Sequence, residues 1–126
     1  MHLPPTRYRD YVDVVVLFDR THVCIPRLFA GSLKRWLRKM GVRSRIYPSK
    51  RGRHHDHLLV EYLLKAKEMH RARLAILVTS DRTLAYRATE RGIVTILGSA
   101  QKPCSEKYME FLLELRRTLQ RHGLVK

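Results

Sequence analysis

The sequence is poor in acidic residues, has two cysteines and lacks any long apolar run. Its 126 residues include 11 Asp and Glu against 26 Lys and Arg, giving a net charge of +15 that excludes an acidic tail protein. The longest apolar runs, residues 14–18 and 74–78, are far shorter than the ~20 residues of a membrane-spanning helix. Residues 1–10 include two prolines and Asp10 where a signal peptide would be apolar. We therefore expect a cytoplasmic protein with no membrane partner.

The two cysteines, Cys24 and Cys104, are far apart in the sequence and show no CxxC spacing. Closely spaced pairs of cysteines are typical of redox and zinc sites. Thiols also stay reduced in the cytoplasm. The sequence therefore predicts two buried thiols rather than a disulfide or a zinc site.

The length and the 44% hydrophobic content predict a single domain over residues 1–126, since such a chain buries roughly two-thirds of its unfolded surface. Runs rich in Val, Ile and Leu predict strands, and segments with apolar residues at three-to-four spacing predict helices. The expected strands are 12–18, 42–47, 74–78 and 93–97, and the expected helices are 26–40, 56–70, 81–91 and 105–122. This alternation predicts a three-layer α/β/α fold around a parallel sheet of about four strands, in the order 2-1-3-4.

Three acidic residues are predicted to meet at one edge of this sheet. Asp19 directly follows the first strand, Asp81 follows the third by two residues, and Asp56 begins the helix that leaves the second. In an open α/β sheet, ligands bind outside the carboxyl ends of the strands, where the winding reverses. Neighbouring strands lie about 4.8 Å apart, so carboxylates on the first and third strands can share one cation.

Carboxylates that lie close together repel one another, and a divalent cation removes that cost. Oxygen ligands favour Mg²⁺ or Mn²⁺, which activates water and stabilises the leaving oxygen of a phosphodiester. Thr79 and Ser80 are placed to orient Asp81 or a metal-bound water. The structural alternative is that Asp56 and Asp81 only cap helices and that Asp19 only ends a strand.

Three segments, read in order, resemble the PIN-like nuclease superfamily. They are "VVVLFDRTHV", with its terminal Asp, "HHDHLLVEYLLKAKE", a helix that begins near an Asp, and "ILVTSDRTLAYRATERGIVTIL", the most specific of the three. The resemblance covers about residues 12–97 and implies a metal-dependent ribonuclease whose catalytic, metal-holding residues are Asp19, Asp56 and Asp81. It also implies Glu61 as an auxiliary metal ligand, although Glu61 is about 140° around the helix from Asp56, a position that favours a solvated or structural acid instead.

The sequence departs from full PIN domains in two places. Residues 20–55 contain no Asp or Glu, although these domains usually carry a further acid there, and Thr83 stands where another Asp is often found. A set of three acids is closer to the shorter PIN-like and NYN-like branches. The departures leave open a second function, a non-catalytic RNA-binding protein with a degenerate acid site.

Residues 20–55 also hold eleven Lys and Arg. A charged face is ordinarily just solvated, but a merely soluble surface would intersperse acids, so phosphate binding is the better interpretation. Arg20 and Arg82 each follow a candidate metal ligand and are expected at the scissile phosphate. The expected RNA-binding residues are Arg20, Arg35, Arg38, Lys39, Arg43, Arg45, Lys50, Arg51, Arg53 and Arg82.

The last predicted helix has an apolar face that includes Tyr108, Phe111 and Leu115. Such a helix either completes a face of its own sheet or pairs with a second copy of the chain. A homodimer is therefore a possible assembly. Between the two functions, the acids at all three expected positions favour the Mg²⁺- or Mn²⁺-dependent endoribonuclease over the binding protein.

Overall fold

Four parallel strands form one sheet in the part of the chain that the computed structural model describes, residues 11–49 and 56–126, without the side chains of Asp56 and His57. The strands are β1 (Val14–Phe18), β2 (Ser44–Pro48), β3 (Leu74–Thr79) and β4 (Val94–Leu97), in the order β2-β1-β3-β4. The predicted parallel sheet and its strand order are thus confirmed.

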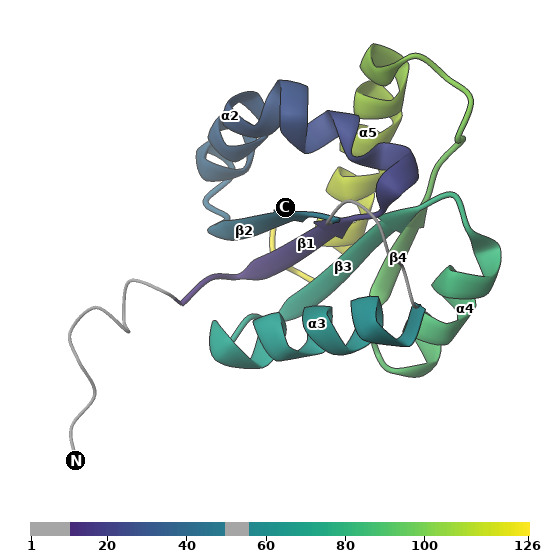
Figure 1. The fold of residues 1–126 in the computed structure, drawn as a ribbon. Helices are drawn as coiled ribbons and strands as arrows, with labels where there is room; N and C mark the ends of the chain where they lie inside the picture. The colour runs from purple at the N-terminus through teal and green to yellow at the C-terminus, as the bar shows by residue number, and fades with distance from the viewer. Residues whose placement is uncertain (1–10, 50–55) are drawn as a thin grey trace.

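Helices cover both faces of the sheet and complete three layers (Figure 1). The short 3-10 helix η1 (Arg20–His22) leads into α2 (Cys24–Lys39), which shares one face with α5 (Cys104–Arg121). The other face carries α3 (Asp56–Met69) and α4 (Arg82–Glu90). This arrangement confirms the predicted α/β/α fold.

The central strands are buried along their whole length, because helices cover both of their faces. All five residues of β1 and all six of β3 are buried, and their β-branched side chains suit such a position. Val14 pairs with Ser44 on one side and with Leu74 on the other. The amino ends of these strands therefore share one edge of the sheet, and the carboxyl ends share the opposite edge.

The elements begin and end within a few residues of the predicted positions. α2 starts two residues before Pro26, which still lies in the first turn, where a backbone N–H has no partner within the helix. The strand predicted at 42–47 starts at Ser44 instead, because the Val42 N–H donates to the Leu37 carbonyl and closes α2. Gly41 makes that turn with a φ of 78°, in the region that favours glycine.

Alternate residues of the strands point into two separate cores. Val14, Val16 and Phe18 belong to the core under α2 and α5, whereas Val15 and Leu17 belong to the core under α3 and α4. This division follows from the two-residue repeat of a strand. Each core joins residues from distant segments, so the edges of the sheet are held in fixed positions.

α5 completes the sheet face beside α2. The Phe111 ring packs edge-on against Phe18, with centroids 5.0 Å apart, and the Tyr108 ring stacks on Phe29 at 4.3 Å. Its apolar face is therefore buried within the chain, and a homodimer stays a prediction.

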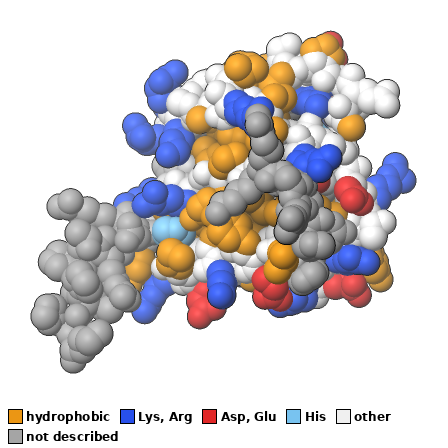
Figure 2. Space-filling model, viewed as in Figure 1, with side chains coloured by type: hydrophobic (Ala, Val, Ile, Leu, Met, Phe, Trp, Pro, Cys, Tyr) orange, Lys and Arg blue, Asp and Glu red, His pale blue; other side chains and the backbone are white. Residues whose placement is uncertain are grey.

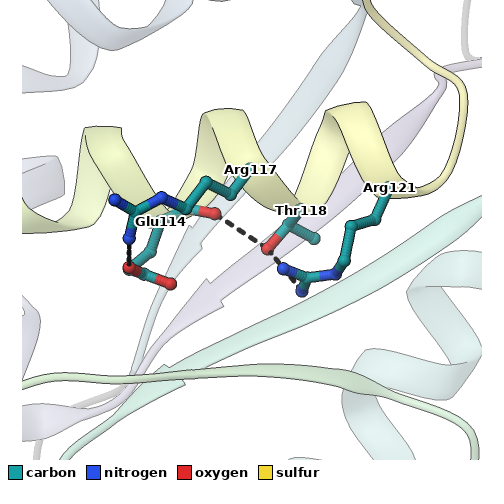
Figure 3. Close-up of polar contacts among 4 residues, drawn as sticks. All are labelled: Glu114, Arg117, Thr118 and Arg121. Atoms are coloured by element: carbon teal, nitrogen blue, oxygen red, sulfur yellow. Dashed lines mark hydrogen bonds and ion pairs between the residues drawn. The ribbon is translucent and has the colours of Figure 1, made fainter.

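α5 also carries a set of polar contacts toward its carboxyl end. Figure 3 shows Arg117 pairing with Glu114 at 2.6 Å, while the Thr118 hydroxyl donates to the Glu114 carbonyl at 2.8 Å. Arg121 donates to the same hydroxyl at 3.4 Å. These contacts join residues three or four positions apart, as expected for neighbours on a helix, and they extend from the buried Thr118 to the exposed Arg117 and Arg121. No helix of the described chain has the length and apolar character needed to cross a membrane.

The prediction of two separate buried thiols was wrong, because Cys24 and Cys104 form a disulfide. Their Cα atoms lie 6.1 Å apart although 80 positions separate them in the sequence. The parallel topology explains the error: α2 follows β1 and α5 follows β4, so both helices start at the carboxyl edge, on the same face. Sequence spacing alone does not show this proximity.

Candidate functional site

Two of the three predicted metal ligands lie at the carboxyl ends of neighbouring strands. Asp19 immediately follows β1, and Asp81 follows β3 and precedes α4. β1 and β3 pair directly over their full common length. The strand order therefore brings residues that are far apart in the sequence to the same edge, as predicted.

Asp19 is a buried carboxylate with only 8% of its surface exposed. Its Oδ1 accepts a hydrogen bond from the Arg20 backbone N–H at 2.8 Å, and its Oδ2 accepts one from the Thr79 hydroxyl at 2.8 Å. Its own backbone N–H donates to the Val78 carbonyl at 2.9 Å, so the backbone and the side chain are both fixed against β3.

Thr79 joins the two acidic segments. This fully buried hydroxyl donates to Asp19 and also accepts the Asp81 backbone N–H at 3.0 Å. The sequence predicted that Thr79 orients Asp81. It gave no signal for the bond to Asp19, because that contact depends on strand pairing.

Asp81 is exposed, and its Oδ1 accepts the Leu84 N–H at 3.1 Å as the N-cap of α4. Capping is one of the ordinary roles of an Asp at a helix start. Because each carboxylate oxygen accepts more than one bond, the cap leaves acceptor sites on this side chain. Asp81 can therefore cap α4 and still bind a metal ion.

The other two predicted ligands, Asp56 and Glu61, both belong to α3. Asp56 begins α3, whose first turn lies at the carboxyl edge (Figure 1), but its side chain is outside the described part of the chain. Glu61, further along α3, pairs with Arg91 at 2.7 Å in a half-exposed ion pair. Within the described residues, no three His, Cys, Asp or Glu side chains are grouped closely enough to hold a metal ion.

A cleft of about 510 Å³ opens beside Asp81, between the β3–α4 turn and the loop after β4. Ser80 and Arg82, which flank Asp81 in the sequence, both line it. The remaining lining residues are Leu97, Gly98, Ser99, Ala100 and Gln101. The sequence did not identify the loop after β4 as part of a site, since this loop carries no charged residue next to the strand.

His22 is a buried histidine near this cleft that the sequence did not mark as a site residue. It is 1% exposed, and its Nδ1 lies 2.9 Å from the Thr21 hydroxyl. Burial, and next the positive charge of Lys107, lower the pKa of its imidazole, so the neutral form is favoured. The ring packs so closely on Gly98 that a Cβ there would lie 3.0 Å from Cε1 and closer still to Nε2.

The predicted RNA-binding residues divide between the two edges of the sheet. Arg20 and Arg82 are exposed at the carboxyl edge. By contrast, Arg35, Arg38 and Lys39 lie in the second half of α2, which runs toward the amino edge, where Arg43 and Arg45 flank the start of β2. The remaining predicted residues, Lys50, Arg51 and Arg53, lie outside the described part of the chain.

Figure 2 shows the same division on the surface. Lys and Arg side chains gather at the left of the view, over the end of α2 and the start of β2. Asp and Glu side chains appear lower and to the right, over α3 and α4. Lys and Arg side chains also lie at the right of the view and along its lower edge, beside the acidic ones, so among the described residues only the left side is free of visible acids.

The chain matches no protein-family model and no curated protein sequence.

Proposed function

We propose that the protein is a PIN-like, metal-dependent endoribonuclease that hydrolyses RNA phosphodiesters at the carboxyl edge of the sheet. The observation that carries the proposal is the Thr79 link: one buried hydroxyl bonds the Asp19 carboxylate at 2.8 Å and the Asp81 backbone at 3.0 Å. Ser80 and Arg82, which flank Asp81 in the sequence, line a cleft at the same edge, although neither Asp19 nor Asp81 is among its lining residues. The cytoplasmic location stays a prediction, and the Cys24–Cys104 disulfide counts against it, because thiols are kept reduced in that compartment.

The donor set fits Mg²⁺ or Mn²⁺. Asp19 is buried, yet it makes no ion pair with any described side chain, so its charge is compensated only by hydrogen bonds. Burying an ionised carboxylate without a cation is costly, and a bound divalent ion offsets that cost. Mg²⁺ uses one or two carboxylates and keeps several waters, so Asp19 and Asp81 suffice for part of its coordination, with Asp56 as the proposed third ligand.

When bound, the metal ion supplies an activated water and stabilises the leaving oxygen of the phosphodiester. The chain's own residues position the substrate. Arg82 is exposed on the cleft wall and neutralises a phosphate there, while Arg20 lies next to Asp19. Ser80, Ser99 and Gln101 give the cleft hydrogen-bonding groups that suit a ribose or phosphate.

The decisive experiment replaces Asp81 by Asn and measures Mn²⁺-dependent cleavage of a labelled RNA. Asn caps a helix about as well as Asp, so the variant should fold like the parent. Loss of a charged ligand should lower the cleavage rate by about 100-fold or more, since weakening even the outer partners of a metal site costs 10–100-fold. Chelation with EDTA should abolish cleavage by the parent, and Mn²⁺ should restore it.

The matched control is Glu90→Gln, which makes the same change of charge at the far end of α4. Equal cleavage by Asp81→Asn and Glu90→Gln would exclude Asp81 from the reaction.

The second candidate function is a non-catalytic RNA-binding protein. It would be established if the parent, Asp81→Asn and Glu90→Gln all bind RNA and none of them cleaves it. That function is favoured by the position of five of the seven described candidate RNA-binding residues toward the amino edge. Each assay is run with and without a dithiol reductant, because the cytoplasm keeps thiols reduced.

A further inference from the structure

A basic groove lies at the amino edge of the sheet, on the opposite side from the acids. It has a volume of about 220 Å³ and lies between the second half of α2 and the start of β2. Its lining residues are Val12, Lys34, Arg38, Val42, Arg43, Ser44 and Arg45. We call it the amino-edge groove.

Four of these seven residues are cations. Lys34 and Arg38 stand one turn apart on α2, and Arg43 and Arg45 stand two positions apart at the start of β2, so each pair shares a side of its element. Neither Lys34 nor Arg38 has an ion pair with any described acid. Asp13 adjoins the groove, where its Oδ2 accepts the Arg43 backbone N–H at 2.8 Å, but it is not among the lining residues.

The lining fits a chain of phosphates. No carboxylate and no aromatic ring lines the groove among the described residues, so it offers charge and hydrogen-bond donors but no surface on which a base can stack. A membrane surface fits less well, because peripheral binding also needs apolar side chains that insert into the lipid. None of the large apolar side chains exposed in the described chain lines the groove.

The groove is separated from the acids by the length of a strand. β1 has five residues between the two edges, which corresponds to about 16 Å at the rise of a β-strand. A single phosphate therefore cannot reach both places. α2 connects them, because it starts just after Arg20 at the carboxyl edge and carries exposed Arg27, Lys34 and Arg38 along the way.

We propose that the amino-edge groove anchors the phosphate backbone of RNA, at a site separate from the one where cleavage is proposed. Binding at the groove does not depend on cleavage. The choice of RNA as the phosphate chain and the connection to the carboxylate edge rest on the proposed function. The anchor binds without base specificity, and it holds RNA segments that extend several nucleotides from the scissile phosphate.

The test reverses two groove charges in the Asp81→Asn background, where RNA is not consumed. Lys34→Glu with Arg38→Glu should weaken binding of a ~20-nucleotide single-stranded RNA by at least 10-fold and lower the salt slope by about 1 to 1.5. The control, Lys65→Glu with Arg116→Glu, makes the same net change at exposed positions of α3 and α5. Equal weakening by both pairs would show an effect of net charge alone and overturn the groove.

A milder pair, Lys34→Gln with Arg38→Gln, replaces the charge reversals if circular dichroism shows a loss of fold. Anisotropy titrations also use duplex DNA of the same length and phosphatidylserine vesicles. Tighter binding to either than to the RNA would overturn the assignment to RNA.

The second arm measures cleavage by the same variants in the Asp81 parent. In the parent, lengthening the RNA from about 3 to about 20 nucleotides should lower KM. This decrease in KM should be smaller in the groove variant, while kcat on the long RNA stays close to the parent value. If KM decreases with RNA length by the same factor in the parent and the groove variant, the groove does not hold the RNA that is cleaved. If no protein cleaves RNA, the proposed function fails, whereas the binding arm still decides the groove.

Discussion

The two edges of the same four strands differ in how they use polar residues. At the carboxyl edge, polar groups are buried and joined: Thr79 bonds Asp19, and His22 packs on Gly98. At the amino edge, the cations of the groove are exposed, and the Asp13 carboxylate accepts the Arg43 backbone N–H. There the Asp13 carbonyl accepts the N–H groups of Arg73 and Leu74, at 2.9 and 3.2 Å.

This difference separates stability from recognition. A buried hydrogen-bonded group is costly to disturb, because its partner is left without water or a bond. Exposed charges contribute little to folding, yet they dominate the attraction of a polyanion. Substitutions of the buried, hydrogen-bonded groups at the carboxyl edge should therefore destabilise the fold, whereas substitutions of the exposed groove cations should alter mainly salt-dependent binding.

The largest effect should follow reduction of the Cys24–Cys104 disulfide at the carboxyl edge. Opening a link that closes a loop of 80 positions restores chain entropy to the unfolded state and should lower the free energy of unfolding by about 4 kcal/mol. Urea denaturation with and without a dithiol reductant measures the difference.

The control for this reduction is the double variant Cys24→Ser with Cys104→Ser, whose stability should not respond to the reductant. Two free thiols in the purified protein, detected by mass spectrometry after alkylation, would contradict the disulfide.

The next effect concerns Thr79→Val, which keeps the shape of the side chain but removes the hydroxyl. Asp19 Oδ2 then loses its buried donor and the Asp81 N–H loses its acceptor, so unfolding should become easier by about 2–3 kcal/mol. Thr79→Ser should recover most of this stability. The control is Thr95→Val on β4, whose hydroxyl makes only an exposed contact at 3.4 Å and which should change stability by less than about 0.5 kcal/mol. Equal losses at the two threonines would remove the contrast between buried and exposed polar groups.

The smallest effect comes from adding one methyl group at Gly98. The new Cβ would overlap the buried His22 ring, and relieving that overlap should cost about 1–2 kcal/mol. Gly31→Ala in α2 is the control, because its Cβ would meet only Arg35 Nη1 at an ordinary 3.6 Å. That change should stabilise the protein by about 0.5–1 kcal/mol, since Ala favours a helix over Gly. Thermal unfolding measures the change in stability of both variants. A Gly98→Ala variant more stable than the parent would disprove the close packing on His22.

The sequence predicted the fold well because its signals are local and periodic. Buried runs such as 74–79 have the composition of a central strand, and Gly41 and Gly92 mark helix ends with φ values of 78° and 83°. It also predicted that Asp19 and Asp81 share an edge, since the position of a residue after a strand fixes the end of the sheet at which it lies.

The tertiary structure alone decided which side chains touch. The disulfide, the bond between Thr79 and Asp19, and the packing of His22 on Gly98 each join residues 60 or more positions apart. Tertiary packing also divided the predicted RNA-binding residues between two places. Arg20 and Arg82 lie beside the acids at the carboxyl edge, whereas α2 carries its later cations to the amino edge. Strand and helix patterns repeat within a few residues and are encoded locally. Contacts between distant segments depend on the order of the strands and the rotation of each helix, which only the packed core determines.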